Sequence, residues 1–418
     1  MDQLLTFAIR ITARPSSTVF EHSVTNWDRT TVTFPSVDEV AKTDAFPTAI
    51  WQLDPHSEGM LSVAAGRGGP FDVHWEIHGT GPVKLVLIGG LGVVKSSWQR
   101  QTMHFGHLNR DRYSVLIFDN RGIGRSDKPL MRYSTSAMAA DLLEVLDHLV
   151  WTEEHQLHIC GISMGGMIAQ ELAYAAPHRI ASLNLICTAA TIENTTSFTE
   201  NMINRITLLL PKRLDSSHIL YKSIYSLYKT HLIPSNLIRS YPLTPAPFNP
   251  NSLDRTVSYT ATKIFPESWL AAPDDAILPD ETVPYCRKPL GGRGWPYGRF
   301  GSNYARFAAQ EIAKQRDRHG FAKHGFLLQM VAAGWHHKSA AQLRELGDKV
   351  GRDRILVLHG TEDNIISVPH GRKLIEYLRP GKGLVVDGMG HAPIAERTQW
   401  FNDLLAEMCA TGEQLSGR

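Results

Sequence analysis

The sequence is poor in the features that mark several large classes of protein. Its 418 residues include only four cysteines, too few for a disulfide framework and without the spacing of a metal-ligand cluster. No apolar run approaches the roughly 18 residues of a membrane-spanning helix, so no stable membrane insertion is expected. The formal net charge is only +2, which gives no reason to expect nucleic acid as a partner.

The overall amino-acid composition is that of a globular protein. Hydrophobic residues make up 43% and charged residues 20% of the chain, which excludes a disordered chain, a collagen and a coiled coil. The unpaired cysteines indicate a reducing compartment, and we expect a cytoplasmic protein. Arg10 and Arg14 among Ser and Thr residues leave mitochondrial targeting as an alternative, against which Asp2 and Glu21 argue. The composition leaves the oligomeric state open.

Short apolar runs alternate with helical patterns in two parts of the chain. Strands are expected at residues 71–78, 83–88, 114–118, 157–160, 182–187, 354–359 and 384–386, and helices at 136–150, 164–176 and about 370–378. Continuous Val, Ile and Leu runs separated by helices predict a parallel sheet that is covered on both faces. The expected fold class is therefore α/β, a doubly wound and mostly parallel sheet.

Other segments break this alternation. Residues 1–70 have weak periodicity and many Ser, Thr and Pro residues, which predicts an N-terminal extension that packs loosely on the rest. Residues 191–344 predict a large helical cap insertion over one edge of the sheet, since a structureless loop of that length is rare. Its expected helices are 202–210, 216–232 and 304–315, with an irregular stretch at 241–301 that includes a solvated loop at 287–297. The core would then comprise residues 71–190 and 345–410, followed by a tail at 411–418.

The strongest motif is Gly161-Ile162-Ser163-Met164-Gly165, which follows an expected strand and precedes an expected helix. A nucleophile on a sharp strand-to-helix turn adopts a strained backbone conformation, and the residues two positions away must be small. The N-terminus of the helix also favours developing negative charge. The context predicts that Ser163 is a nucleophile and not merely a helix cap.

A serine hydroxyl needs a general base, and the base needs an acid that orients it. Asp363 ends the loop that follows the strand at 354–359, and His391 follows the strand at 384–386. We therefore expect a catalytic triad of Ser163, Asp363 and His391. Glu362 is the alternative acid, whereas His359 lies inside the run that delivers the acid and is interpreted as a strand-end residue.

When a serine attacks a substrate carbonyl, the carbonyl oxygen becomes negatively charged and requires hydrogen-bond donors. One expected donor is the backbone N–H of Met164, the residue after the nucleophile. The second is expected from the glycine-rich loop at residues 89–92, where we select the backbone N–H of Leu91. A plain tight turn is the alternative interpretation of that loop.

Two further features are interpreted as structural. The segment 119–127 contains Gly122 and Gly124 but lacks the third glycine of a dinucleotide-binding motif, so a turn with a buried Asp–Arg network is expected. The remaining histidines, including His336 and His337, are interpreted as surface or cap residues.

Together these segments resemble the α/β-hydrolase superfamily, in which the triad follows the order Ser, Asp, His. The resemblance covers about residues 71–190 and 345–410. The residues that carry it are Gly89-Gly90-Leu91-Gly92 with Trp98 beyond it, the segment 119–127, Gly161 to Gly166, His359 to Asp363, and Gly388 to His391. The stretch 163–190 looks most like small-molecule ester and lactone hydrolases such as the 3-oxoadipate enol-lactonases, and the whole chain is similar to a group of fungal α/β hydrolases. Many members begin this loop with a histidine, whereas this sequence has Gly89. The difference is expected to affect the rigidity of the loop.

The resemblance implies a serine hydrolase that cleaves a carboxylic ester, lactone or thioester of a fairly apolar small molecule, without a cofactor or a metal. A serine at this position argues against the haloalkane dehalogenases and epoxide hydrolases of the superfamily, which use Asp. Two alternatives stay open: a ligand-binding protein or receptor on the same fold, and acyl transfer or cyclisation in a biosynthetic pathway.

Overall fold

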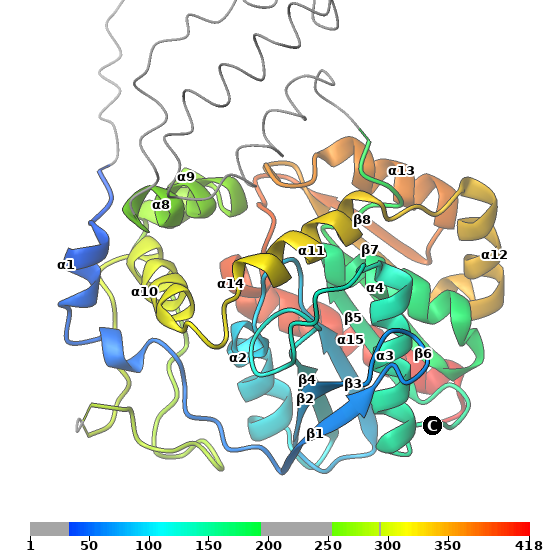
Figure 1. Cartoon of the computed structure of the whole chain (residues 1–418), viewed down its shortest axis with the longest axis horizontal. Helices are drawn as coiled ribbons and strands as arrows, with labels where there is room; N and C mark the ends of the chain where they lie inside the picture. Colours follow the sequence, from blue (N-terminus) through cyan, green and yellow to red (C-terminus); the bar gives the residue numbers. More distant parts are fainter. Residues whose placement is uncertain (1–32, 194–252, 292–293) are drawn as a thin grey trace, which may run out of the picture. The chain divides into compact units, whose positions relative to one another are not determined.

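Eight strands form one sheet in the described part of this computed structural model, which comprises residues 33–193, 253–291 and 294–418 (Figure 1). The strands are β1 Ser57–Val63, β2 Phe71–His78, β3 Val83–Ile88, β4 Tyr113–Phe118, β5 Leu157–Ile162, β6 Ile180–Ile186, β7 Ile355–Gly360 and β8 Lys382–Val386. Their order is β1-β2-β4-β3-β5-β6-β7-β8. β1 and β2 pair antiparallel, as do β2 and β4, and the other neighbours are parallel. The expected mostly parallel α/β sheet is confirmed.

The parallel strands β3 to β7 are mostly apolar because both faces of this part of the sheet are covered. In β3, Leu85 and Leu87 belong to the core on one face, while Val86 and Ile88 belong to the core on the other. This alternation is the two-residue period of a strand whose side chains point to opposite faces. The continuous apolar run in the sequence therefore reports two separate cores.

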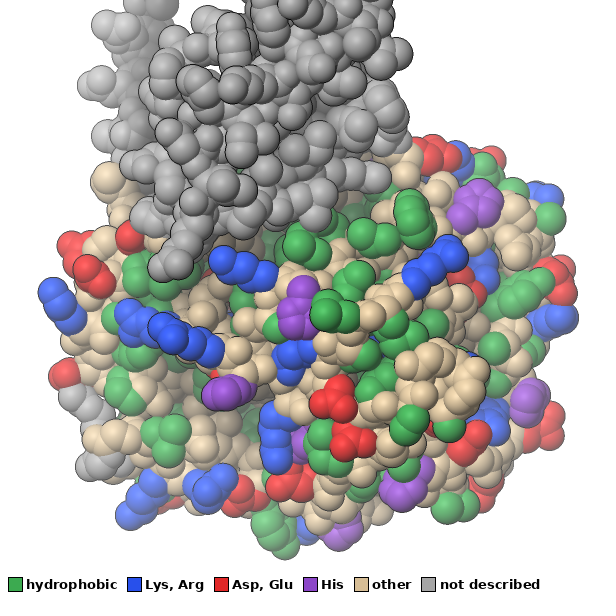
Figure 2. Space-filling view, viewed as in Figure 1, with side chains coloured by type: hydrophobic (Ala, Val, Ile, Leu, Met, Phe, Trp, Pro, Cys, Tyr) green, Lys and Arg blue, Asp and Glu red, His purple; other side chains and the backbone are tan. Residues whose placement is uncertain are grey.

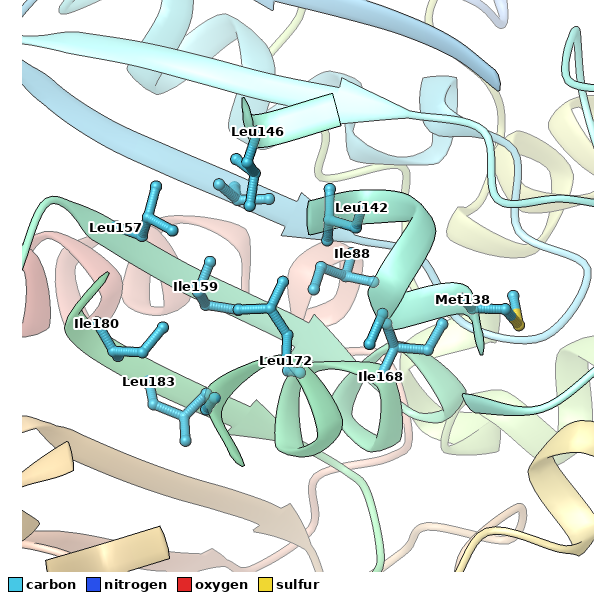
Figure 3. Packing of buried hydrophobic residues seen from close by; sticks show 14 of the residues in the cluster. Ile88, Met138, Leu142, Leu146, Leu157, Ile159, Ile168, Leu172, Ile180 and Leu183 are labelled. Carbon is cyan, nitrogen blue, oxygen red and sulfur yellow. The ribbon is translucent and has the colours of Figure 1, made fainter. Parts of the chain in front are cut away.

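Helices on each face complete these cores. One face is covered by α3 Thr135–His148, α4 Met164–Ala175, α12 Ala340–Val350 and α13 Val368–Leu378. Figure 3 shows Met138 and Leu142 of α3 and Ile168 and Leu172 of α4 against Ile88 and the neighbouring strands. The opposite face carries α2 Gln99–Gln101, the short helices η2 Lys95–Trp98 and η3 Thr102–Leu108, α14 Pro393–Glu396 and α15 Thr398–Leu415.

A third core lies among helices from two distant parts of the sequence. It joins α8 Leu253–Ile264, α9 Glu267–Ala271 and α10 Asn303–Arg316 to α1 Val37–Ala41. Val37 and Val40 of α1 are buried there, and the ring of Phe34 stacks on that of Tyr304 with centroids 4.2 Å apart.

The expectation of a loosely packed N-terminal extension is wrong for residues 34–70. α1 is part of the helical core just described, and β1 pairs with β2 along its whole length, from Ser57 opposite Ile77 to Val63 opposite Phe71. The sheet therefore begins before residue 71. β1 was not predicted because it is an edge strand with one exposed face. Its residues alternate between half-buried and exposed, so its sequence contains no apolar run.

The insertion differs from expectation at three places. α8 occupies part of the stretch expected to be irregular; its Ser, Thr and Tyr content gives a weak helical signal, and Val257 and Ala261 form its buried face. Tyr297, in the loop expected to be solvated, is 1% exposed and accepts a hydrogen bond from the N–H of Gln52. α12 covers the sheet from Ala340, so the core resumes earlier than residue 345.

The remaining predictions for the insertion concern its helices. The helix expected at 304–315 is confirmed as α10, and a further helix, α11 Lys323–Gly334, follows it. The helices expected at 202–210 and 216–232 lie outside the described residues. Among the helices that are described, none is both long and apolar enough to cross a membrane.

Candidate active site

Ser163 lies at the junction between β5 and α4, in a backbone conformation that is rare for any residue except glycine. Its φ is 57° and its ψ is −123°, which is the strained geometry of a nucleophile held on a sharp turn. The turn is fixed on both sides: the N–H of Ser163 donates to the carbonyl of Ile186 at 2.9 Å, and its carbonyl accepts from the hydroxyl of Thr188 at 2.7 Å. The side chain is half-buried.

The glycines on either side of Ser163 are required by close backbone contacts. A Cβ atom on Gly161 would lie 2.3 Å from the carbonyl oxygen of Gly165, and one on Gly165 would lie 2.2 Å from that of Ile88. Neither position can accept a side chain without moving the backbone. The spacing of the motif in the sequence is therefore the spacing that this turn needs.

Asp363 lies in the loop that follows β7, and its carboxylate is fully engaged. Oδ1 accepts hydrogen bonds from the N–H groups of Ile365 at 2.9 Å and Ile366 at 2.8 Å. Oδ2 accepts from Nδ1 of His391 at 2.7 Å. Burial acts to raise the pKa of Asp363, but His391, His359 and the N–H of Ile366 lower it below its ordinary value. The carboxyl is therefore held ionised beside the imidazole.

His391 lies in the loop after β8 and is buried at 6% exposure. Because Asp363 accepts at Nδ1, the neutral imidazole carries its proton there and leaves Nε2 unprotonated; this tautomer is assigned from the hydrogen-bond network. The backbone N–H of His391 donates to the carbonyl of Ile264 at 2.7 Å. The end of α8 therefore helps to fix the loop that carries the histidine, a contact that nothing local in the sequence indicates.

The structure joins Asp363 directly to His391, whereas the Ser163 hydroxyl forms no hydrogen bond to His391 among the described residues. All three follow strands of the parallel part of the sheet, β5, β7 and β8, so they meet at its carboxyl edge. Hydrogen bonds between nucleophile and base are often loose without substrate and tighten when it binds. Glu362, the alternative acid, is exposed to solvent.

The two expected oxyanion donors are backbone N–H groups near Ser163. In the described part of the chain, neither the N–H of Met164 nor that of Leu91 has a protein acceptor. Met164 begins α4, where the first N–H groups lack partners within the helix and attract negative charge. A Cβ on Gly90 would lie 3.1 Å from the Cβ of Ser163, so the loop that contains Leu91 passes directly beside Ser163.

Side chains from outside the loop at 89–95 hold it in place. Asn120 donates to the carbonyl of Gly89 at 3.2 Å, and Asp119 accepts from the N–H of Lys95 at 2.8 Å. The N–H of Gly92 donates to Gln329 of α11 at 2.9 Å. Although Gly89 replaces a histidine common in similar proteins, the loop is therefore anchored at several points.

The segment 119–127 forms the structural turn that we expected. Asp119 is 1% exposed and accepts from the N–H groups of Lys95 and Arg125. Arg121 forms a bidentate ion pair, with both nitrogen–oxygen distances 2.6 Å. Its partner is Asp141 of α3, which lies outside the motif.

Cys187 is a neighbour of the site that sequence reasoning did not assign to it. Its sulfur and the ligand atoms of Asp363 and His391 lie within 4.8 Å of one another. Burial raises the pKa of the Cys187 thiol well above its ordinary value, so the thiol stays protonated and is a poor metal ligand. The cluster is better described as a buried thiol that packs beside the hydrogen-bonded Asp363–His391 pair.

His336 lies after α11, within the segment predicted as the cap insertion, but it is not the surface residue that was the other expectation. It is 2% exposed, and its Nδ1 lies 2.9 Å from the hydroxyl of Thr135. Burial, together with the charges of Lys338 and His337, lowers the pKa of His336 to about 3. His336 and His337 are adjacent, and nothing in the local sequence shows that the first is buried while the second is exposed.

The burial of His336 predicts acid sensitivity of the fold. Its pKa in the folded state is about 3 but about 6.5 when unfolded, so the unfolded chain binds the additional proton between these values. The free energy of unfolding should fall by up to about 1.4 kcal/mol per pH unit below pH 6.5 on this account. Urea unfolding from about pH 7 to about pH 4.5 should show a shallower fall for His336→Asn, which keeps a polar atom for Thr135; an unchanged slope would contradict the assignment.

Comparison with known proteins agrees with this geometry. Residues 84–211 match the family model described as the α/β hydrolase fold, and residues 321–414 match one described as TAP-like protein. Over 120 residues the chain is 34% identical to a putative carbamate hydrolase from Azorhizobium caulinodans, covering 29% of this chain and 42% of that protein. Over 108 residues it is 37% identical to a 3-oxoadipate enol-lactonase from Acinetobacter baylyi, covering 26% and 38%.

Solved structures extend the likeness over most of the chain. A thermophilic esterase from Thermogutta terrifontis matches with a TM-score of 0.56 at 18% identity, covering 85% of this chain and 99% of that one. The enol-lactonase from Burkholderia xenovorans LB400 matches with a TM-score of 0.54 at 18% identity, covering 84% and 100%.

The structure is an α/β protein with a strained strand-to-helix turn after β5, of the kind called a nucleophile elbow. The matches above support a member of the α/β-hydrolase superfamily. The matching segments span about two fifths of the curated relatives' own length.

Proposed function

We propose that the protein is a serine hydrolase that cleaves a carboxylic ester, lactone or thioester of a fairly apolar small molecule. The observation that carries the proposal is the Asp363–His391 hydrogen bond of 2.7 Å at the same sheet edge as the strained Ser163. Relatives named as an enol-lactonase and a carbamate hydrolase support hydrolytic chemistry. The free thiols of all four cysteines support a cytoplasmic location.

In the proposed mechanism, Nε2 of His391 accepts the proton of Ser163 as its oxygen attacks the substrate carbonyl. Asp363 holds the tautomer of His391 and stabilises the imidazolium. The N–H groups of Met164 and Leu91 donate to the oxyanion; removing one such donor typically costs about 100- to 1,000-fold in kcat. His391 then protonates the leaving group, and water activated by His391 releases the acyl group from Ser163.

The proposed preference for an apolar substrate rests on α11. This helix carries Phe326, Leu327, Leu328 and Met330, all only half-buried, and hydrophobic side chains gather on the surface along it (Figure 2). α11 touches the loop that contains Leu91 through the bond between Gln329 and Gly92. An acyl or alcohol group bound beside Ser163 would therefore lie close to apolar side chains.

A fluorophosphonate probe tests the proposal directly. The Ser163 oxygen should form a bond to phosphorus with loss of fluoride, and mass spectrometry of the peptide should map one adduct to Ser163. Ser163→Ala should abolish labelling and His391→Ala should slow it by several orders of magnitude. An ester and thioester series graded by chain length should then identify the acyl preference.

Ser367 provides a matched control. Its hydroxyl lies 3.0 Å from Nδ1 of His370, and its φ is −64°, so it is a serine–histidine pair without the strained turn. Ser367→Ala should label like the wild type. Absence of labelling in folded wild-type protein would contradict the proposal and favour a ligand-binding protein, whereas labelling with product that contains no oxygen from water would indicate acyl transfer.

A further inference from the structure

Gln329 of α11 joins three separate parts of the chain through its side-chain amide. The side chain is fully buried. Its Oε1 accepts a hydrogen bond from the N–H of Gly92 at 2.9 Å, and its Nε2 donates to the carbonyl of Arg121 at 2.8 Å. The amide therefore links the loop after β3 to the loop after β4, and both to the insertion.

Arg121 and α11, which this link joins, are both held rigidly. Arg121 is fixed by its bidentate ion pair with Asp141, and the ring of Phe71 lies 4.6 Å from its guanidinium carbon. α11 lies against the turn at Gly122, because a Cβ on Gly325 would lie 2.0 Å from the carbonyl oxygen of Gly122. A polar bridge between two well-anchored groups transmits position rather than adapting to movement.

The bridge also determines which N–H groups of the loop can face a substrate. The N–H of Gly92 is occupied by Gln329, while the neighbouring N–H of Leu91 has no acceptor among the described residues. Because Asn120 holds the carbonyl of Gly89, the peptide that carries the Leu91 N–H is flanked by an anchor on each side. Its own carbonyl, that of Gly90, accepts only a longer bond of 3.3 Å from the N–H of Val93 within the loop. Losing the Gln329 anchor would therefore let this peptide rotate away from the oxygen above Ser163.

We propose that Gln329 is a positioning residue for the oxyanion hole, through which the insertion sets the orientation of the Leu91 N–H. This inference rests on the proposed function. It makes α11 a part of the catalytic apparatus and not only a wall of the substrate site. The contribution of the bridge should appear in the chemical step, since the oxyanion forms only there.

Gln329→Leu should lower kcat for p-nitrophenyl butyrate by about 10- to 100-fold, a part of the loss expected for a whole oxyanion donor. KM should change by less than about threefold, because the bridge stabilises the transition state more than the bound ester. Labelling of Ser163 by the fluorophosphonate should slow in parallel. The rates are referred to the folded fraction measured by near-UV circular dichroism.

Gln329→Glu gives a signature that a purely structural role would not produce. A protonated carboxyl can accept from Gly92 and donate to the carbonyl of Arg121, so it reproduces the bridge. An ionised carboxylate cannot donate, and it places negative charge beside the developing oxyanion. The ratio of variant to wild-type kcat should therefore rise as the pH falls from about 8 to about 5.5.

Gln99 is a matched control, because its amide makes the same kind of bridge elsewhere. It is 4% exposed, accepts from the N–H of Trp51 at 2.9 Å and donates to the carbonyl of Ala49 at 3.2 Å. Gln99→Leu and Gln99→Glu should lower stability without changing kcat or the pH ratio. If the Gln329 variants behave like the Gln99 variants while wild-type Ser163 is labelled, the inference is overturned and the proposed function stands. If wild-type Ser163 is not labelled, both are overturned.

Discussion

Asp363→Asn is expected to lower kcat/KM by about 10,000-fold while leaving the fold intact. The backbone N–H groups of Ile365 and Ile366 both donate to Oδ1, so an asparagine must keep its carbonyl oxygen at that position. Its NH₂ group then takes the place of Oδ2 and donates to Nδ1 of His391. The imidazole must carry its proton on Nε2 instead, and it can no longer accept the proton of Ser163.

The neighbouring carboxylate supplies the control for this prediction. Glu362 is exposed and was the alternative acid in the sequence, so Glu362→Gln should change kcat/KM by less than about threefold. Both variants are compared in steady-state kinetics with an ester substrate, and NMR of the histidine ring nitrogens reports the tautomer of His391. An inactive Glu362→Gln beside an active Asp363→Asn would reverse the assignment of the acid.

The parts of this structure that could be predicted from the sequence are those determined by local patterns. The buried strands appear as continuous apolar runs because both faces of the sheet are covered. The turn at Ser163 imposes its two glycines through backbone contacts, so the motif and the geometry are the same constraint. Asp363 and His391 could be selected because loops that follow parallel strands meet at one edge of the sheet.

The parts that were missed depend on contacts between distant segments. β1 and α1 each bury only one face, against partners that the local sequence does not specify. Gln329 and His336 have ordinary surface residue types, and only the completed fold encloses them. The carbonyl of Ile264, which fixes the N–H of His391, is a backbone group that any residue could supply. The contacts by which the insertion supports the loops of Leu91 and His391 therefore cannot be predicted before the fold is known.

Asp141→Ala is expected to lower the free energy of unfolding by about 3–5 kcal/mol, because it leaves a buried guanidinium without its carboxylate. The side chain of Arg121 is 0% exposed and that of Asp141 is 6% exposed. Burial raises the pKa of Asp141 even though Arg121 and Arg67 oppose the shift, because burial disfavours the charged form. Urea unfolding measures the loss, and Asp147→Ala is the control, since its carboxylate, paired with Arg179, is 55% exposed and should contribute less than about 1 kcal/mol.

The same substitution should affect activity through the backbone of Arg121. The carbonyl of Arg121 is the acceptor for Gln329, so a displaced Arg121 loosens the link that orients the Leu91 N–H. In the fraction that remains folded, Asp141→Ala should therefore lower kcat in the same direction as Gln329→Leu, and the double variant should lose less than the product of the two single losses. Fully multiplicative effects would instead show that the ion pair stabilises the fold without acting on the oxyanion hole.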